Sequence, residues 1–283
     1  MMERLTSAGG PELRTDRIAA RLAPNRGTKG GSSLIVDGTT QSHVNPADPT
    51  DLQLVYVRML AGFVDELFPA GRAISVLHLG GGALTVPRYI AATRPGSRQL
   101  VLEPDAGLIQ LVRDQLALKS VRGLKVRITD GASGLAALPG GADDLVVLDA
   151  FTGAHMPPEL ATVEFAEQAA RVLRHGGVYL INCSDGGRLT FVRHLIATVR
   201  TVFGFALLLA EPGILRGRRH GNLIVAASAE PLNDAALTRR AAGGLTQARC
   251  VHGTDLDRFA AGAAPLRHGD EIPISEPPRS LWD

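Results

Sequence analysis

Residues Ser75–Tyr89 read SVLHLGGGALTVPRY. The apolar run Val76–Leu79 predicts a β-strand, and three glycines follow it directly. Pro87 is tolerated in the first turn of a helix, and Val86 and Ile90 recur at helical spacing. A strand, a glycine turn and a helix in this order form the nucleotide-binding entry of an open α/β sheet.

The pattern of strands alternating with helices continues after this stretch, which predicts a parallel sheet. The last two predicted strands form a hairpin, which adds an antiparallel edge. The sequence therefore predicts an α/β fold, a class I methyltransferase-like Rossmann domain preceded by a small N-terminal β-element. The predicted strands are 74–79, 99–102, 125–129, 145–148, 178–183, 205–209 and 222–227.

The chain divides into four predicted regions. Residues 1–32 are rich in Gly, Arg, Ala and Pro and are expected to be mobile, with one short helix at 12–22. Residues 33–70 hold a β-hairpin around Asp37-Gly38 and a helix capped by Asp48 or Thr50. The Rossmann-like domain covers 71–230, and 231–283 is a partly disordered extension with one helix near 235–240 and a loop at 274–279.

Composition narrows the class of protein. Of 283 residues, 45% are hydrophobic and 20% charged, and 30 basic residues nearly balance 28 acidic ones, so we expect no nucleic-acid partner. The two cysteines cannot build a disulfide framework or a metal cluster. No secretory signal is visible, and the longest apolar stretch, 203–209, is too short to cross a bilayer. We expect a cytoplasmic protein without metal or membrane contact.

Acidic residues end three successive predicted strands after the glycine turn. Ligands bind outside the carboxyl ends of the strands in open α/β sheets, so Glu103, Asp130 and Asp149 should converge on one cleft. Glu103 is placed to accept hydrogen bonds from ribose hydroxyls, and Asp130 from an adenine amino group. Asp149 is placed to meet a cationic or protonated substrate.

Each of these carboxylates also has a structural interpretation. A Glu or Asp after a strand commonly caps a helix or ends a turn. A dinucleotide-dependent enzyme is disfavoured, because its fingerprint needs a third small residue where Thr85 stands.

Several pieces of the chain, in their order and spacing, resemble the spermidine synthase family over about residues 33–228. The stretch from Asp149 to Phe165, with Pro157-Pro158, looks like the gatekeeping loop of that family. The other matching pieces are Asp37-Gly38-Thr39-Thr40-Gln41, Tyr56, residues 76–82, Glu103, Asp130-Gly131-Ala132 and Asp149.

The resemblance implies an adenosyl sulfonium cofactor, decarboxylated S-adenosylmethionine in true synthases, and an amine acceptor. It implies that Asp149 takes the proton from the attacking amine, and that Tyr56 and Thr152 meet the acceptor. We also expect a homodimer. The residues implied to hold the cofactor are Gln41, Gly80, Gly81, Gly82, Glu103, Asp130, Gly131 and Ala132.

The chain departs from the family where charged amines are recognised. Ala83 stands where the family has an acid that meets the cofactor ammonium, and Thr152 replaces a second acid that grips the far amine. Val57-Arg58 follow Tyr56 in place of a polar residue and Glu, and no tyrosine occurs in 211–221. Each lost charge-assisted contact removes on the order of 1.5–3 kcal/mol.

We therefore expect a spermidine-synthase-like aminopropyltransferase. An S-adenosylmethionine-dependent methyltransferase is the first alternative, and a non-catalytic nucleoside-binding or oligomerisation module is the second. One motif has no place in any of these functions. Arg216, Arg218, Arg219 and His220 cluster in the last hairpin turn, where they form a solvated turn or attract an anionic substrate or partner.

Overall fold

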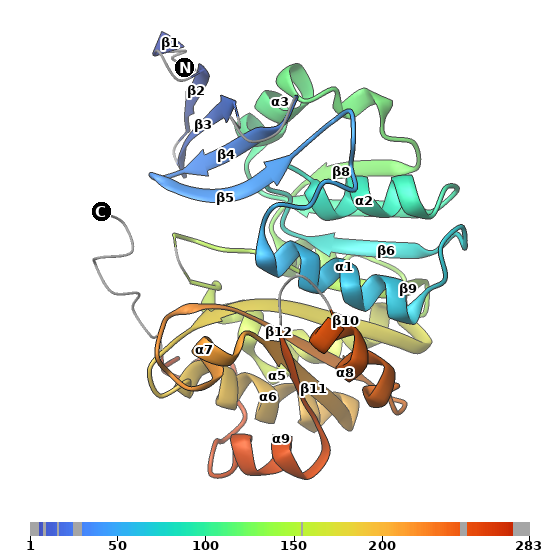
Figure 1. Cartoon of the computed structure of the whole chain (residues 1–283), viewed down its shortest axis with the longest axis vertical. Coiled ribbons are helices and arrows are strands. Elements are labelled where there is room, and N and C mark those ends of the chain that lie inside the picture. The colour runs from blue at the N-terminus through green and yellow to red at the C-terminus, as the bar shows by residue number, and fades with distance from the viewer. Residues whose placement is uncertain are drawn as a thin grey trace.

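The computed structural model describes residues 6–7, 10–15, 17–24, 30–153, 155–243 and 248–273. A five-stranded antiparallel sheet near the N-terminus sits beside a larger eight-stranded sheet whose two faces are covered by helices (Figure 1). No helix in the described ranges is long and apolar enough to cross a membrane.

The eight-stranded sheet has the predicted mixed topology. Its order is β13-β11-β12-β10-β9-β6-β7-β8, with parallel pairs from β10 to β8 and antiparallel pairs at β10–β12, β12–β11 and β11–β13. The predicted Rossmann-like fold with an antiparallel terminal hairpin is confirmed. Its strands are β6 (Ser75–Leu79), β7 (Arg98–Glu103), β8 (Leu124–Ile128), β9 (Asp143–Leu148), β10 (Leu173–Asp185), β11 (Phe205–Ala210), β12 (Gly221–Ser228) and β13 (Arg249–Val251).

Helices pack on both faces of this sheet because its strands are apolar on both. Helices α1, α2 and α8 bury one face, and α5, α6 and α9 the other. The helices are α1 (Val55–Leu67), α2 (Thr85–Thr93), α3 (Ala106–Gln115), α4 (Gly131–Ala136), α5 (Val163–Val172), α6 (Thr190–Phe203), α7 (Pro212–Leu215), α8 (Asp234–Gly243) and α9 (Gly253–Ala260), with 3₁₀ turns at Leu118–Ser120 and Pro158–Ala161.

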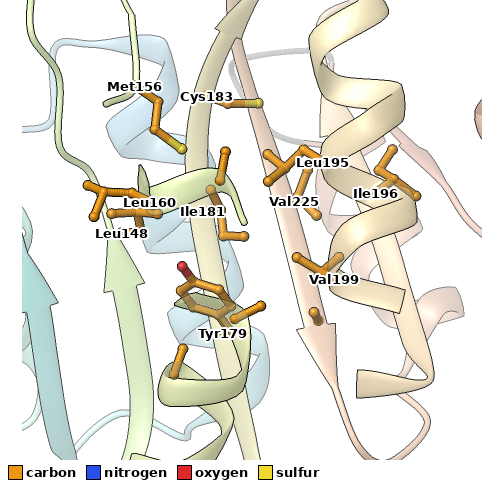
Figure 2. Packing of buried hydrophobic residues seen from close by; sticks show 14 of the residues in the cluster. Leu148, Met156, Leu160, Tyr179, Ile181, Cys183, Leu195, Ile196, Val199 and Val225 are labelled. Carbon is orange, nitrogen blue, oxygen red and sulfur yellow. The ribbon is translucent and has the colours of Figure 1, made fainter. Parts of the chain in front are cut away.

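Strand β10 shows how alternation builds the core. Val178 and Leu180 point to one face, while Tyr179 and Ile181 point to the other, as the two-residue period of a strand requires. Figure 2 shows Ile181 in the same cluster as Leu195 of α6. Each such fully buried aliphatic side chain stabilises the fold by about 1.5–3 kcal/mol. This packing fixes where the carboxyl end of β10 lies.

The N-terminal sheet consists of β1 (Thr6–Ser7), β2 (Gly10–Arg14), β3 (Ala19–Pro24), β4 (Ser32–Val36) and β5 (Thr39–Val44). The hairpin predicted around Asp37-Gly38 is confirmed: β4 and β5 pair, and both turn residues have positive φ. The sheet packs on α3 through a third apolar cluster that includes Leu22, Leu34 and Val112.

The helix predicted at 12–22 is wrong. Leu13, Ala20 and Leu22 are buried, while the residues between Ala20 and Leu22 and after it are not, which is the period of a strand. Pairing to β4 and burial against α3 outweigh the weak helical pattern. Most of the described residues of 1–32 thus lie in strands, and the others lie in the connections between them, whereas the loop expected at 274–279 lies outside the described residues. The division into four regions remains a prediction.

Candidate functional site

A cavity of about 440 Å³ opens at the carboxyl ends of β6, β7, β8 and β9. All eleven residues that the sequence singled out for the site line it, so the structure brings together residues from six separate segments. They are Gln41, Tyr56, Gly80, Gly81, Gly82, Glu103, Asp130, Gly131, Ala132, Asp149 and Thr152. Their roles remain predictions.

The glycine turn after β6 lets two strands end in close contact. Gly80 has φ +100°, and a Cβ at this position would lie 2.2 Å from the carbonyl oxygen of Asp149. Gly82 also has positive φ, and a Cβ there would lie 2.8 Å from Oγ of Ser42. Both positions require a positive φ and the absence of a Cβ atom, and only glycine meets both requirements. The turn therefore sets the distance between β6 and the residue that ends β9.

Glu103 joins this turn to the end of β7. Its Oε2 accepts a hydrogen bond of 2.8 Å from the backbone N–H of Gly81, and its Oε1 accepts one of 3.0 Å from Asp105. Burial raises the pKa of Glu103, and these two hydrogen bonds partly offset the rise. Each carboxylate oxygen accepts two hydrogen bonds, so Glu103 keeps acceptor capacity toward the cavity.

Asp130 ends the loop after β8 and caps α4. Its Oδ1 accepts a hydrogen bond of 2.8 Å from Ser133, and hydrogen bonds from this turn lower the pKa of Asp130. Gly131 and Ala132 form the first turn of α4 and face the cavity with it. The structural interpretation as a helix cap is thus correct, and it leaves an ionised carboxylate on the cavity wall.

Asp149 is the buried carboxylate of the site. Its Oδ1 accepts a hydrogen bond of 2.8 Å from Nδ2 of Asn182, and Oδ1 of Asn182 in turn accepts one of 3.1 Å from Asn222. Burial raises the pKa of Asp149 to about 6, against the lowering effect of the Asn182 bond. Sequence reasoning missed both asparagines, because their strands come later in the chain and only the sheet order places them beside Asp149.

Tyr56 and Gln41 hold the loop that follows Asp149 in place through two hydrogen bonds. The Tyr56 hydroxyl donates to the carbonyl of Gln41 (2.9 Å), and Nε2 of Gln41 donates to the carbonyl of Gly153 (3.3 Å). Within the loop, the N–H of Thr152 donates to the carbonyl of His155 (2.8 Å). Burial, then the charge of Asp149, raise the pKa of Tyr56 well above its usual value, so the phenol stays neutral.

The cavity is strongly acidic. Six carboxylates line it and, among the described lining residues, one guanidinium does, that of Arg17; the carboxylates are Asp37, Glu103, Asp105, Asp130, Asp149 and Glu159. His78 adds no charge, because burial lowers its pKa to about 4 and its ring nitrogen is bonded to Gln99 (2.9 Å). Such a cavity attracts a cation.

Arg17 and Ile18 are lining residues that the sequence did not reveal, since they fall in the segment expected to be mobile. They lie on the turn between β2 and β3. Thr15 ties this turn to the site by donating a hydrogen bond of 2.7 Å to Asp105. The N-terminal sheet therefore forms one wall of the cavity.

Two further titratable residues, both in β10, have structural roles. Asp185 ends β10 but accepts hydrogen bonds from the backbone of Gly186 and Val192, so it holds the start of α6 and does not line the cavity. Burial raises the pKa of the Cys183 thiol well above its usual value, which makes it unreactive. No group of three metal-binding side chains occurs within the described residues.

Comparison with curated proteins finds polyamine aminopropyltransferases, while no family model matches the chain. The protein of Vibrio vulnificus is 32% identical over 162 residues, which are 56% of this chain. That match spans about half of the relative, 52% of its length. The protein of Neisseria meningitidis serogroup B is 27% identical over 229 residues, 79% of this chain and 81% of the relative.

Comparison with solved structures extends the match to nearly the whole chain. A probable spermidine synthase from Corynebacterium glutamicum superposes with a TM-score of 0.85 at 30% identity, over 96% of this chain and 100% of that one. A spermidine synthase in complex with the transition-state analogue AdoDATO (TM-score 0.59, 18% identity, 77% and 73% covered) shares the fold. The fold, the full-length likeness to the Corynebacterium protein and the curated relatives agree: the chain belongs to the spermidine synthase, or polyamine aminopropyltransferase, family.

Proposed function

We propose that the protein transfers an aminopropyl group from decarboxylated S-adenosylmethionine to an amine acceptor. The observation that carries this proposal is the charge of the cavity, where six carboxylates face one guanidinium among the lining residues that the structure describes. The donor bears a sulfonium and an ammonium group, and the acceptor bears an amine. A cavity with this excess of acid favours cationic ligands over anionic ones.

The residues around the glycine turn would hold the nucleoside. Glu103 offers lone pairs to the ribose hydroxyls, and its bond to the N–H of Gly81 fixes its position. Asp130 offers an acceptor for the adenine amino group beside Ala132. Gly80 and Gly82 keep this wall free of side chains, which allows the ligand to approach the backbone.

Asp149 would serve as the base. With a pKa of about 6 it is mostly ionised near neutral pH, yet basic enough to accept a proton. The sulfonium supplies an activated carbon–sulfur bond. The acceptor nitrogen forms the new C–N bond while the C–S bond breaks, its electron pair remains on sulfur, and the amine proton passes to Asp149. Positioning of the two reactants supplies most of the rate enhancement.

The methyltransferase alternative fits the charges less well. S-adenosylmethionine carries a carboxylate, which needs a cationic or backbone partner. Arg17 is the cation among the described lining residues, and its charge acts on Glu103, at the ribose end. Ala83 is fully buried and does not line the cavity, so its change from an acid creates no carboxylate site.

Calorimetric titration with decarboxylated S-adenosylmethionine, S-adenosylmethionine and methylthioadenosine tests the proposal. We expect the decarboxylated form to bind at least about tenfold more tightly than S-adenosylmethionine, because it lacks the carboxylate that the acidic cavity repels. Tighter binding of S-adenosylmethionine would favour the methyltransferase. Binding of none of the three would favour the second alternative in its form of a non-catalytic oligomerisation module. The expected homodimer remains a prediction.

A further inference from the structure

The cavity at the carboxyl ends of the strands continues inward on the face of the sheet that α1 and α2 cover. Its wall there includes Val57 of α1, Val86 of α2, Val147 of β9 and His78 of β6. The three valines belong to the apolar cluster between the sheet and these helices. We call the part of the cavity lined by these four residues the inner recess. The polar group of this set is the imidazole of His78.

The strand register places His78 and the carboxylate of Asp149 on the same face of the sheet. His78 pairs with Val147 across β6 and β9, and Asp149 lies two residues beyond Val147, where side chains point to the same side. The ladder continues to this point, because the N–H of Asp149 donates to the carbonyl of Leu79 (2.9 Å). Strand spacing puts the Cα atoms of His78 and Asp149 about 8 Å apart. A short ligand chain can therefore contact both side chains.

The hydrogen bonds of Gln99 fix which nitrogen of His78 carries the hydrogen. The amide nitrogen of Gln99 donates to the carbonyl of Pro87 (2.9 Å), and a carbonyl can only accept. The amide oxygen of Gln99 therefore faces Nε2 of His78 (2.9 Å), so Nε2 donates. In a neutral imidazole the other nitrogen is then an acceptor, which makes Nδ1 the nitrogen with a lone pair for a ligand.

The pair of His78 and Gln99 also has a structural interpretation, because it ties β6 and β7 to α2. Both side chains are buried, and a buried polar pair of this kind must be hydrogen-bonded. This role uses Nε2 and the amide of Gln99, and it does not need Nδ1. A structural role and a ligand contact therefore depend on different atoms of the same ring.

We propose that Nδ1 of His78 binds the terminal ammonium of the aminopropyl group of the donor, with the methylene chain packed on the valines of the inner recess. This inference rests on the proposed function and adds a specificity-determining residue to it. The ammonium donates a hydrogen bond to Nδ1, and Asp149 on the same face supplies the opposite charge. His78 thus replaces the acid that the family has at the position of Ala83, which is buried here and does not line the cavity.

The same contact disfavours a donor that carries a carboxylate. S-adenosylmethionine bears its carboxylate on the carbon that holds the ammonium, so it would bring negative charge against the lone pair of Nδ1 and toward Asp149. Burial lowers the pKa of His78 to about 4, so the ring does not become a cation near neutral pH. His78 therefore selects the decarboxylated donor without a charge of its own.

Two ligands that differ only in the ammonium test the inference: 5′-propylthio-5′-deoxyadenosine and its 3-aminopropyl counterpart. By calorimetry near neutral pH, we expect the wild-type chain to bind the aminopropyl compound at least about tenfold more tightly. His78→Leu should bind the two compounds within about twofold of each other. Its affinity for the propyl compound should stay within about threefold of the wild-type value, because that ligand makes no bond to Nδ1.

Gln99→Leu is the matched variant. It breaks the same buried hydrogen bond and the tie to Pro87, but it leaves Nδ1 in the inner recess, so it should keep at least about a fivefold preference for the aminopropyl compound. His175→Leu removes an exposed histidine at the amino end of β10 and should behave as the wild type. An equal loss of preference in Gln99→Leu and His78→Leu would assign the pair to the packing of α2 and overturn the inference.

A second measurement covers the case in which His78→Leu does not fold. In the wild-type chain with nitrogen-15-labelled histidine, the Nδ1 resonance of a neutral histidine should move on addition of the aminopropyl compound and stay in place with the propyl compound. The absence of this response would overturn the inference, as would a wild-type chain that binds both compounds equally.

The outcomes separate this inference from the proposed function. Transfer from decarboxylated S-adenosylmethionine to an amine, with an unchanged aminopropyl preference in His78→Leu, would overturn the inference and keep the transferase. A preference that depends on His78, without transfer to any amine, would support the ammonium site while the transfer reaction fails.

Discussion

Nδ2 of Asn182 donates a hydrogen bond of 2.8 Å to Oδ1 of Asp149 across the ends of two neighbouring parallel strands. The register explains the contact. Ile181 of β10 pairs with Leu148 of β9, and Asn182 and Asp149 are the residues that directly follow these two in the chain. Asn222 donates to the carbonyl oxygen of the Asn182 side chain, so the amide group faces Asp149 with its nitrogen. The carboxylate is thus buried with a neutral donor, which leaves its pKa raised.

The first prediction concerns the chemistry of Asp149. Asp149→Asn keeps the shape and removes the proton acceptor, so turnover should fall by about 10²–10⁴-fold. Methylthioadenosine affinity, measured by calorimetry, should stay within about twofold. In the wild type, kcat/KM should rise with pH through about 6, since the base acts only when ionised. Full activity of the variant would remove Asp149 from the reaction.

The same substitution should stabilise the fold. The pKa of Asp149 is about 6 in the folded chain and 3.8 as the unperturbed value, so ionisation opposes folding above pH 6. Asp149→Asn should therefore raise the free energy of unfolding at pH 8 by on the order of 2–3 kcal/mol. The gain should fade as pH falls from 6 to about 4. Urea denaturation at pH 8 and at about pH 4 measures this gain in the free energy of unfolding. An equal gain at the two pH values would exclude buried ionisation as its cause.

A third prediction separates Asn182 from a structural asparagine. Its hydrogen bond lowers the pKa of Asp149, so Asn182→Leu should shift the acidic limb of the kcat/KM profile to higher pH. Turnover at neutral pH should fall by about tenfold, while methylthioadenosine affinity is kept. Asn182→Gln, which retains the donor, is the matched variant. A reduced rate with an unmoved pH limb would show that Asn182 only supports the strand.

The sequence was sufficient to predict the fold and the strand ends that line the cavity. Strand ends are marked locally by Gly80, Glu103, Asp130 and Asp149, and a parallel sheet brings all its carboxyl ends to one edge. The placement of these residues at one cavity could therefore be predicted from their spacing, while their chemical roles stay predictions. Asn182 could not, because nothing near it in the chain shows which strand lies beside β9.

The N-terminal wall was missed for a different reason. Leu13, Ala20 and Leu22 are few and separated by polar residues, so their strand period is weak until β4 and α3 pack against them. Arg17 owes its place at the cavity to this tertiary pairing. A second cavity of about 220 Å³ could not be predicted from the sequence either, because it forms where α1, α7 and β12 meet.

Thr15 tests the role of that wall. Its hydroxyl donates to Asp105 (2.7 Å) and accepts from the N–H of Ile18 (3.1 Å), so it holds the turn that carries Arg17 over the cavity. Thr15→Val removes both bonds at nearly constant volume and should weaken methylthioadenosine binding by about 1 kcal/mol, roughly fivefold. Thr201→Val, an exposed site on α6, is the control. Equal affinities in both variants would mean that the N-terminal sheet does not contact the ligand.

The last prediction concerns Glu103, whose carboxylate has two tasks in one place. Glu103→Ala removes the acceptor for ribose and leaves the N–H groups of Gly81 and Asp105 without their partner, so it should weaken methylthioadenosine binding by roughly 2–4 kcal/mol and destabilise the fold. Glu103→Gln keeps only one of the two turn bonds, because its amide oxygen still accepts from Gly81, whereas its NH₂ can accept neither from the N–H of Asp105 nor from a ribose hydroxyl. We expect the Gln variant to be destabilised less than Glu103→Ala and still to bind at least about tenfold more weakly than the wild type. Glu167→Gln, exposed on α5, controls for the loss of charge. Wild-type affinity in a folded Glu103→Gln variant would assign Glu103 to the turn alone.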